Sequence, residues 1–425
     1  MSRERYRRIL FSSGIGLAQR IAQLLSTLVT LPLTLHALGV AGFGIWAAAT
    51  SLAWLSGVLD LGLGSALLTL LPESIAKGQS DKVGSYVAAS LAAGSALTII
   101  IFAVCGLLLW VGAVHAPGMP FLVAGIALAL NIPIGIGRDV WFGLQKGYVA
   151  GYWDFAQTLL TLGLLIATAI AGGGVAAMVT AVYVAILLTN LASLAHLVIS
   201  HKLVRPSGPV SVKSIRIVAG RGSLLLAITI AGACAYSLDT LMALTWLGPV
   251  AAAQMAVVIR VCTTAAGILN IITQPLWPEF VEAVTVNDRP WLRRVLRDGT
   301  LGLAAMACAG SLVIVACGAP ILRLWLHQDL HLSQPLLWVM GGWIVASNLG
   351  RISSLLLNAA LVLWRQIFIT VACTAVGLPL KFLAAKMFGV IGILGVSPAL
   401  WAIVVVPAYF WLGWCATECC EYRGR

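Results

Sequence analysis

The chain has 425 residues, of which 60% are hydrophobic and only 9% charged, with a mean hydropathy of +1.01 and a formal net charge of +12. This composition excludes an ordinary soluble domain, because about one quarter of the residues in such domains are charged. The apolar runs are continuous, which excludes a transmembrane barrel, whose strands alternate between apolar and polar residues. The sequence therefore predicts an all-α polytopic membrane protein.

Apolar runs of about 20 residues, the length that a helix needs to cross a hydrocarbon core, recur about twelve times along the chain. In the first half we expect membrane spans at residues 9–36, 43–71, 86–113, 120–142, 153–171 and 175–199. In the second half we expect spans at residues 223–246, 252–275, 299–319, 337–360, 367–386 and 390–414. The segments between the runs are then turns on alternate sides of the membrane.

Lysine and arginine are distributed unevenly among these turns. If the N-terminus is cytoplasmic, the turns on the opposite side contain only Arg323 and Lys386, and the cytoplasmic segments contain most of the other basic residues. This positive-inside bias predicts a multi-pass protein with both termini in the cytoplasm. The net charge needs no nucleic-acid partner, because basic residues beside the spans interact with anionic membrane lipids.

Short matching motifs indicate that the two halves are repeats. Leu38-Gly39 follows the first span as Leu247-Gly248 follows the seventh, and Pro72-Glu73 ends the second span as Pro278-Glu279 follows the eighth. Six spans in each half return the chain to the same side of the membrane, so the repeats are expected to be parallel. We expect a six-helix lobe at 1–205, a cytoplasmic linker at 206–222, a second six-helix lobe at 223–425, and a central cavity.

Three spans carry an arginine on a polar face, together with polar residues at helical spacing. These candidate cavity residues are Arg20 and Gln23 on the first span, Arg260 and Asn270 on the eighth, and Arg351 and Asn358 on the tenth. Hydrogen bonds between packed helices would also explain the uncharged members. The arginines favour a water-filled cavity, since each costs about 2.5–3.5 kcal/mol at the centre of a bilayer. A surplus of positive charge in that cavity suits an anionic ligand.

Two acidic residues, Asp60 and Asp239, lie deep in the expected spans. Both are candidates for a coupling acid that gains and loses a proton, because a carboxyl in a low dielectric takes up a proton more readily. Asp239 would alternatively form a permanent ion pair with Arg260 or Arg20. Lys381 lies toward the outer end of the eleventh span, where a long side chain can extend to the interface.

Several short motifs occur in an order that resembles a known family. They are the N-terminal basic cluster, Leu38-Gly39 with Gly42-Phe43-Gly44, Asp60-Leu61-Gly62-Leu63, Asp239-Thr240 with Leu247-Gly248, and Pro278-Glu279. This order resembles the Wzx-like polysaccharide-unit flippases, which belong to the same superfamily as the lipid II flippases and the multidrug and toxin extruders.

The resemblance implies two lobes of helices in a bacterial inner membrane. It also implies export of lipid-diphosphate-linked oligosaccharide units by alternating access, for surface polysaccharide biosynthesis. By helix position, the cationic cavity residues of the superfamily would correspond to Arg20 and Arg260. A polysaccharide polymerase and the chain-length machinery would be protein partners.

Two alternatives remain. A multidrug-type exporter would share the fold, but cationic drugs favour a cavity with surplus acid. A membrane polymerase or ligase acting on lipid-linked glycan would need a large outer loop with catalytic residues, and the longest outer segment is only about Pro320 to Leu336. We therefore expect no enzyme. We also expect no metal or cofactor, because the cysteines and histidines form no ligand spacing and no phosphate-binding loop is present.

Overall fold

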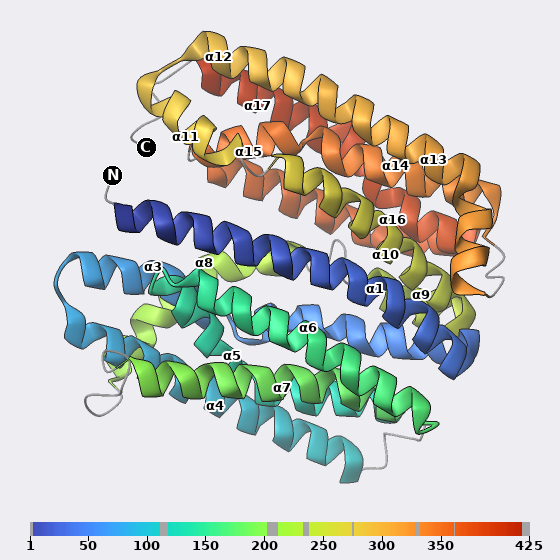
Figure 1. Cartoon of the computed structure of the whole chain (residues 1–425), viewed down its shortest axis with the longest axis horizontal. Helices are drawn as coiled ribbons and strands as arrows, with labels where there is room; N and C mark the ends of the chain where they lie inside the picture. The colour runs from blue at the N-terminus through green and yellow to red at the C-terminus, as the bar shows by residue number, and fades with distance from the viewer. Residues whose placement is uncertain are drawn as a thin grey trace. The chain divides into compact units, whose positions relative to one another are not determined.

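The computed structural model describes residues 3–110, 118–201, 211–232, 238–273, 276–327, 332–360 and 362–418. These residues are helical almost throughout and contain no strand. A helix satisfies its own backbone hydrogen bonds, which is required of any segment that crosses hydrocarbon. The all-α polytopic class predicted from the composition is confirmed. The chain forms two compact units, Met1–Ala233 and Cys234–Arg425 (Figure 1).

Unit 1 is built around a buried apolar cluster between α3, α4, α5, α7 and α8, which includes Leu67, Val87, Ile136 and Trp141. Its helices are α1 (Arg3–Ser51), α2 (Ser56–Leu59), α3 (Leu63–Ala76), α4 (Ser80–Trp110), α5 (Met119–Gly143), α6 (Gly147–Ile170), α7 (Val175–Ser200) and α8 (Val212–Gly232). A short 3-10 helix, η1 (Leu52–Leu55), joins α1 to α2.

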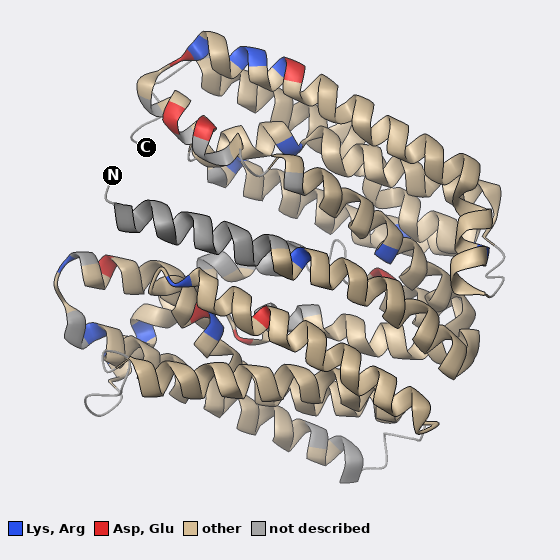
Figure 2. Cartoon of the chain, viewed as in Figure 1, with Lys and Arg blue, Asp and Glu red and all other residues tan. Residues whose placement is uncertain are grey.

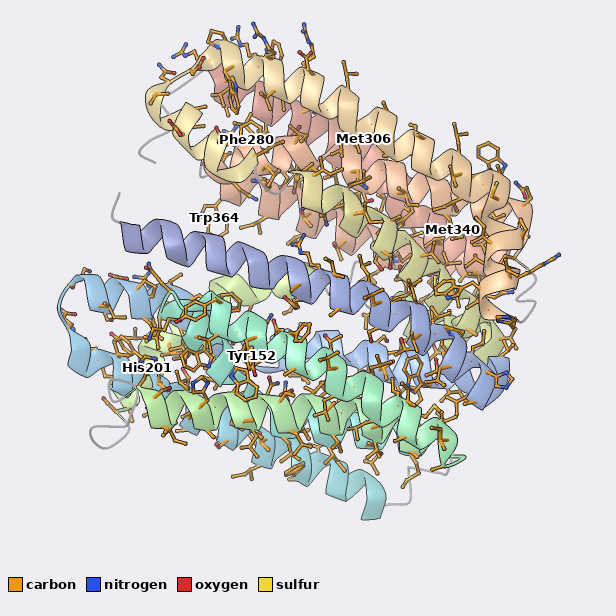
Figure 3. The ribbon with its side chains drawn as sticks, in the orientation of Figure 1. Tyr152, His201, Phe280, Met306, Met340 and Trp364 are labelled. Atoms are coloured by element: carbon orange, nitrogen blue, oxygen red, sulfur yellow. The ribbon has the colours of Figure 1, made fainter. Side chains whose placement is uncertain are left out.

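Unit 2 is built around a second buried cluster, in which Phe280 and Met340 are fully enclosed. Met306 and Trp364 are exposed at the surface of this unit (Figure 3). The helices are α9 (Asp239–Leu247), α10 (Pro249–Thr273), α11 (Leu276–Val286), α12 (Arg289–Arg294), α13 (Thr300–Leu326), α14 (Gln334–Leu349), α15 (Arg351–Ala359), α16 (Leu363–Leu400) and α17 (Val406–Glu418). Two π-helical turns, η5 (Val295–Gly299) and η6 (Trp401–Val405), precede α13 and α17.

Within the described residues, eight helices are long and apolar enough to cross a membrane. This number is lower than the predicted one in part because α1 and α16 each continue past a glycine from one expected span into the next, and because the second expected span is interrupted. The glycines with positive φ at these turns are Gly39 (66°) and Gly172 (69°) in unit 1, and Gly248 (95°) and Gly389 (59°) in unit 2. Gly39 and Gly248 follow the first expected span of their unit, and Gly172 and Gly389 separate the fifth expected span of their unit from the sixth.

The expected second span is interrupted. It breaks at Asp60-Leu61-Gly62, where Leu61 and Gly62 have positive φ, between α2 and α3. Of the expected seventh span, the structure describes α8, which packs on α3 and α4 of unit 1, and α9, which packs on α10 and α16 of unit 2. The boundary between the units thus falls between Ala233 and Cys234. It differs from the expected linker at 206–222, since the chain is already helical from Val212.

A close backbone contact holds α8 against the interruption in the second span. A Cβ atom placed on Gly222 would lie 2.6 Å from the carbonyl oxygen of Gly62, and a Cβ atom on Gly62 would lie 2.3 Å from the carbonyl oxygen of Gly222. Real side chains do not tolerate such distances. Both positions therefore require glycine, and Gly62 also requires it for its φ of 77°.

We predict that Gly222→Ala destabilises the protein, because the added methyl group overlaps the Gly62 carbonyl. Overpacking of this kind costs about 1–3 kcal/mol. The matched control is Gly220→Ala on the same helix, where a Cβ atom meets nothing within 4 Å. In a helix interior that change is favourable by up to about 1 kcal/mol. Thermal unfolding of both purified variants measures the difference, and equal midpoints would contradict the close contact.

Candidate functional site

The polar face of α1 divides into a covered part and an accessible part. Thr27, Thr30 and Thr34 are buried. The Thr27 hydroxyl donates to the Gln23 carbonyl at 2.8 Å, and the Thr34 hydroxyl donates to the Thr30 carbonyl at 2.7 Å. These hydroxyl groups are thus satisfied within the helix. Arg20 is half-buried and Gln23 is exposed, so the first turns of the predicted face are the part open to a ligand.

In unit 2, the polar face of α10 carries Arg260, which is exposed although it lies inside an apolar helix. Thr263, also exposed, donates to the Ile259 carbonyl at 2.8 Å. Asn270 is half-buried, and its side-chain oxygen Oδ1 has no hydrogen-bond partner among the described residues. Polar groups exposed on an apolar helix are costly against lipid. This face therefore fits contact with water or a polar ligand.

Arg351 and Asn358 lie in a polar cluster inside unit 2, between α10, α15 and α16. The Nε atom of Arg351 donates to the Thr273 hydroxyl at 2.9 Å, at the end of α10. The Gln366 amide donates to the Asn358 side-chain oxygen at 3.1 Å. Thr273 and Gln366 belong to this cluster but not to the predicted set, because the partner of each lies on another helix.

Arg260 and Arg351 are not side by side. Arg351 meets α10 at Thr273, which is about 20 Å along the helix axis from Arg260 at 1.5 Å per residue. Figure 2 shows that charged residues of unit 2 gather around α11 and α12 at one end of the bundle, with few along the apolar helices. The two guanidinium groups are thus separate within unit 2.

Asp239 forms an ion pair, but with Lys381 and not with either predicted arginine. The Lys381 ammonium nitrogen lies 2.5 Å from Asp239 Oδ1, and the two side chains are only 3% and 4% exposed. The expectation that Lys381 extends to the membrane interface is wrong, since the residue is 2% exposed. Packing of α9 against α16 places both charges in the interior, where each stabilises the other.

Asp60 occupies the interruption of the second span. Its carboxylate accepts hydrogen bonds from the backbone N–H groups of Gly62 at 2.8 Å and Gly64 at 3.2 Å. The side chain of Asp139 on α5 approaches the same place, because an oxygen of each carboxylate lies within 3.0 Å of the position that a Gly64 Cβ would occupy. Two carboxyl groups are therefore neighbours within unit 1, an arrangement that the sequence did not indicate.

Arg138, which precedes Asp139 in the sequence, forms a salt bridge. Arg138 Nη2 lies 2.9 Å from Asp154 Oδ2, and Arg138 Nε donates to Asp154 Oδ1 at 3.0 Å. This paired geometry engages the guanidinium with Asp154 on α6. No group of three or more metal-ligating side chains occurs in the part of the chain that the structure describes.

We predict that breaking the Asp239–Lys381 pair on one side is far more damaging than replacing both residues. Asp239→Asn or Lys381→Met alone leaves a charge buried without its counter-ion, which costs about 3–5 kcal/mol. The double variant Asp239→Asn with Lys381→Met removes both charges. Its thermal midpoint and membrane abundance should lie closer to wild type than those of either single variant. Additive losses would show that the two charges do not interact.

Comparisons with known proteins find the fold but no family. No protein-family model matches the chain, and no curated protein matches it. An inward-facing multidrug resistance MATE family transporter of the MOP superfamily shares 15% identity at a TM-score of 0.72, over 97% of this chain and 100% of that chain. The lipid II flippase MurJ, in an inward closed conformation, shares 12% identity at a TM-score of 0.69, over 95% of this chain and 87% of MurJ.

A third similar structure is a MOP superfamily transporter from Pyrococcus furiosus, described as having a binding pocket of reverse polarity. It shares 15% identity at a TM-score of 0.61, over 97% of this chain and 95% of that chain. At such identities the likeness concerns the fold alone. The chain therefore has the fold of MOP superfamily transporters, over nearly its whole length.

Proposed function

We propose that this protein is a flippase that translocates lipid-diphosphate-linked oligosaccharide units by alternating access, for surface polysaccharide biosynthesis. The observation that carries the proposal is the exposed Arg260 on the polar face of an apolar helix. A guanidinium keeps its charge when buried and offers planar paired donors that match phosphate oxygens. The shared fold is consistent with this cargo, because MurJ is a lipid II flippase.

Unit 1 and unit 2 would each contribute to recognition. Arg20 and Gln23 present a cation and an amide on α1, and Arg260 presents a cation on α10. Asn270 on the same helix has a buried side-chain oxygen without a partner among the described residues. Arg351 and Asn358 lie farther along the same unit, and we propose that they contact the glycan rather than the diphosphate.

Alternating access converts this recognition into transport. In transporters built from repeats, one lobe rocks against the other around a shared site. A bound diphosphate shifts the balance between inward-open and outward-open forms only if it binds one form more tightly. We propose that Arg20 of unit 1 and Arg260 of unit 2 provide this difference.

A multidrug-type exporter is the second candidate, and one observation favours it. Asp60 and Asp139 place two carboxyl groups together in unit 1, and a cationic drug or a coupling cation binds at such sites. In unit 2 the charges favour the flippase, because the Asp239 carboxylate is already neutralised by Lys381. The exporter would therefore recognise its cargo mainly through unit 1, and the flippase mainly through unit 2.

We also propose that the protein resides in a bacterial inner membrane with both termini in the cytoplasm. The basis is the predominance of Lys and Arg on one set of turns. A polysaccharide polymerase and the chain-length machinery are proposed partners, since a flipped unit must be consumed on the far side of the membrane. Membrane lipids and the lipid-linked oligosaccharide are the other proposed partners.

We predict that Arg20→Ala, Arg260→Ala and Arg351→Ala each reduce export. Loss of a charge-assisted hydrogen bond costs about 1.5–3 kcal/mol, which weakens binding about ten- to hundredfold. Lysine at the same positions should rescue only in part, because an ammonium lacks the planar fork. The assay is restoration of surface polysaccharide in a strain that lacks its flippase, with membrane abundance measured in parallel.

The matched control for these variants is Arg221→Ala. Arg221 does not belong to the predicted polar faces, and its Nη2 atom lies 3.4 Å from Glu73 Oε2. Export by this variant should equal that of wild type at equal abundance. Full export by a triple alanine variant at normal abundance would overturn the diphosphate proposal and leave the arginines with a structural role.

We predict that Asp60, rather than Asp239, sets the response of transport to a proton gradient. Asp60→Asn imitates the protonated acid permanently, so export should lose its dependence on external pH. The double variant Asp239→Asn with Lys381→Met should retain that dependence, since its pair carries no net charge. Export measured between pH 6 and 8 distinguishes the two acids. Unchanged pH dependence in Asp60→Asn would remove the coupling role from this residue.

A further inference from the structure

The segment formed by α12 and η5, which connects α11 to α13, has one buried face and one exposed face. Leu292 is buried in the apolar cluster of unit 2, and the Trp291 ring packs on the Phe280 ring at a centroid distance of 5.7 Å. The Asp288 carboxylate accepts a hydrogen bond from the backbone N–H of Trp291 at 3.1 Å, at the start of α12. The apolar face thus fixes α12 to unit 2 and leaves the polar face at the surface.

The connecting segment carries four arginines, which are Arg289, Arg293, Arg294 and Arg297. The first two are engaged by neighbouring side chains. Arg289 Nε donates to the Asn287 side-chain oxygen at 3.0 Å. Arg293 Nε donates to the Thr417 hydroxyl at 3.2 Å, and its guanidinium carbon lies 5.3 Å from the centroid of the Trp414 ring on α17. These two arginines therefore serve the packing of the segment.

Arg294 and Arg297 are exposed. Arg297 Nε lies 2.7 Å from Asp298 Oδ1, but these side chains are 67% and 51% exposed. A salt bridge at such exposure contributes little to stability, so Arg297 can exchange this partner for another anion. The Arg294 side chain forms no hydrogen bond with the described residues, although its charge also acts on Asp298. Two cations and one carboxylate leave a surplus positive charge at the surface.

The same exposed side continues as an apolar surface. Residues 299–322 contain no charged side chain, and Leu301 and Leu312 of α13 are 63% and 59% exposed. Arg294, Arg297 and Leu301 are exposed at intervals of three and four residues, which places them on one side of the helix. Figure 2 shows charged residues at the α12 end of this long helix and an uncharged stretch after them. A phospholipid has the same order, since its phosphate is joined to acyl chains.

We propose that the exposed side of α12 and η5, together with the α13 face that follows, binds an acidic phospholipid of the surrounding membrane. The guanidinium groups of Arg294 and Arg297 offer planar paired donors to the phosphate oxygens. The acyl chains lie along the exposed apolar face of α13. An acidic headgroup matches the surplus positive charge, whereas a zwitterionic headgroup brings a cation of its own. A soluble anion would leave the apolar face without a partner.

The test measures the thermal midpoint of the full-length protein, purified in a nonionic detergent, as lipid is added. Phosphatidylglycerol is compared with phosphatidylcholine that carries the same acyl chains, and with inorganic phosphate. A ligand that binds only the folded state raises the midpoint according to its concentration and affinity. Phosphatidylglycerol should raise the midpoint in a saturable way, phosphatidylcholine should raise it less, and inorganic phosphate should leave it unchanged.

The double variant Arg294→Gln with Arg297→Gln should raise the half-saturating concentration of phosphatidylglycerol about tenfold or more, since charge-assisted hydrogen bonds to the phosphate are lost. Asp298→Asn should lower this concentration, because the substitution frees Arg297 and removes a carboxylate that repels the phosphate. The matched control is Arg323→Gln, which removes an exposed arginine near the other end of α13 and should leave the concentration unchanged. Opposite effects of the first two changes separate lipid binding from loss of folded protein.

Equal midpoint rises with phosphatidylglycerol and phosphatidylcholine would overturn the inference, because the headgroup charge would then play no part. An equal rise with inorganic phosphate would assign the site to a soluble anion and overturn it as well. The same holds if the double variant binds phosphatidylglycerol as wild type does, or if Arg323→Gln weakens binding as much as the double variant.

If the double variant is not recovered from membranes, Asp298→Asn decides by itself, and an unchanged half-saturating concentration in that variant contradicts the proposed contact. The inference goes beyond the proposed function, because it holds for any cargo. None of these measurements involves the cargo, so their outcome is independent of the proposed flippase activity.

Discussion

The cost of placing charge in hydrocarbon is the constraint on which unit 2 most depends. Asp239 and Lys381 meet at 2.5 Å in the interior, and this contact joins the start of α9 to α16 across 142 residues of sequence. Either ion without the other would have to reach water or lose its charge. The ion pair thus adds to the packing of α9 on α16, and α10 and its polar face follow directly after α9 in the chain.

The same constraint explains how unit 1 tolerates an interrupted span. Backbone groups that leave the helical pattern inside a membrane must find other partners. Asp60 supplies them by accepting hydrogen bonds from the N–H groups of Gly62 and Gly64. The backbone of α8 then lies directly against Gly62 at Gly222. The acid proposed to bind a proton also holds the break together, so protonation would act on the contact between α3 and α8.

Charge is distributed differently in the two units, and this bears on what each can recognise. In unit 2 the buried acid is neutralised locally, while Arg260 is exposed on an apolar helix. In unit 1 two carboxyl groups adjoin Gly64, and Arg138 is engaged with Asp154. An anionic headgroup is therefore best matched by α10, and a proton by the carboxyl pair. A flippase driven by a proton gradient would use both features.

The sequence by itself determined the membrane class, the order of the spans and the turns, because hydrophobicity and glycine act locally. Gly39 and Gly248 end helices with positive φ, as expected from their matching motifs. Local patterns also placed Arg20, Arg260 and Asn270 on polar faces. Only the tertiary structure decided which charges meet. Lys381 is 2% exposed because α9 packs on α16, and Asp139 adjoins Asp60 because α5 packs on α3. Packing between remote segments sets such depths and pairings, and no periodicity within one helix encodes them.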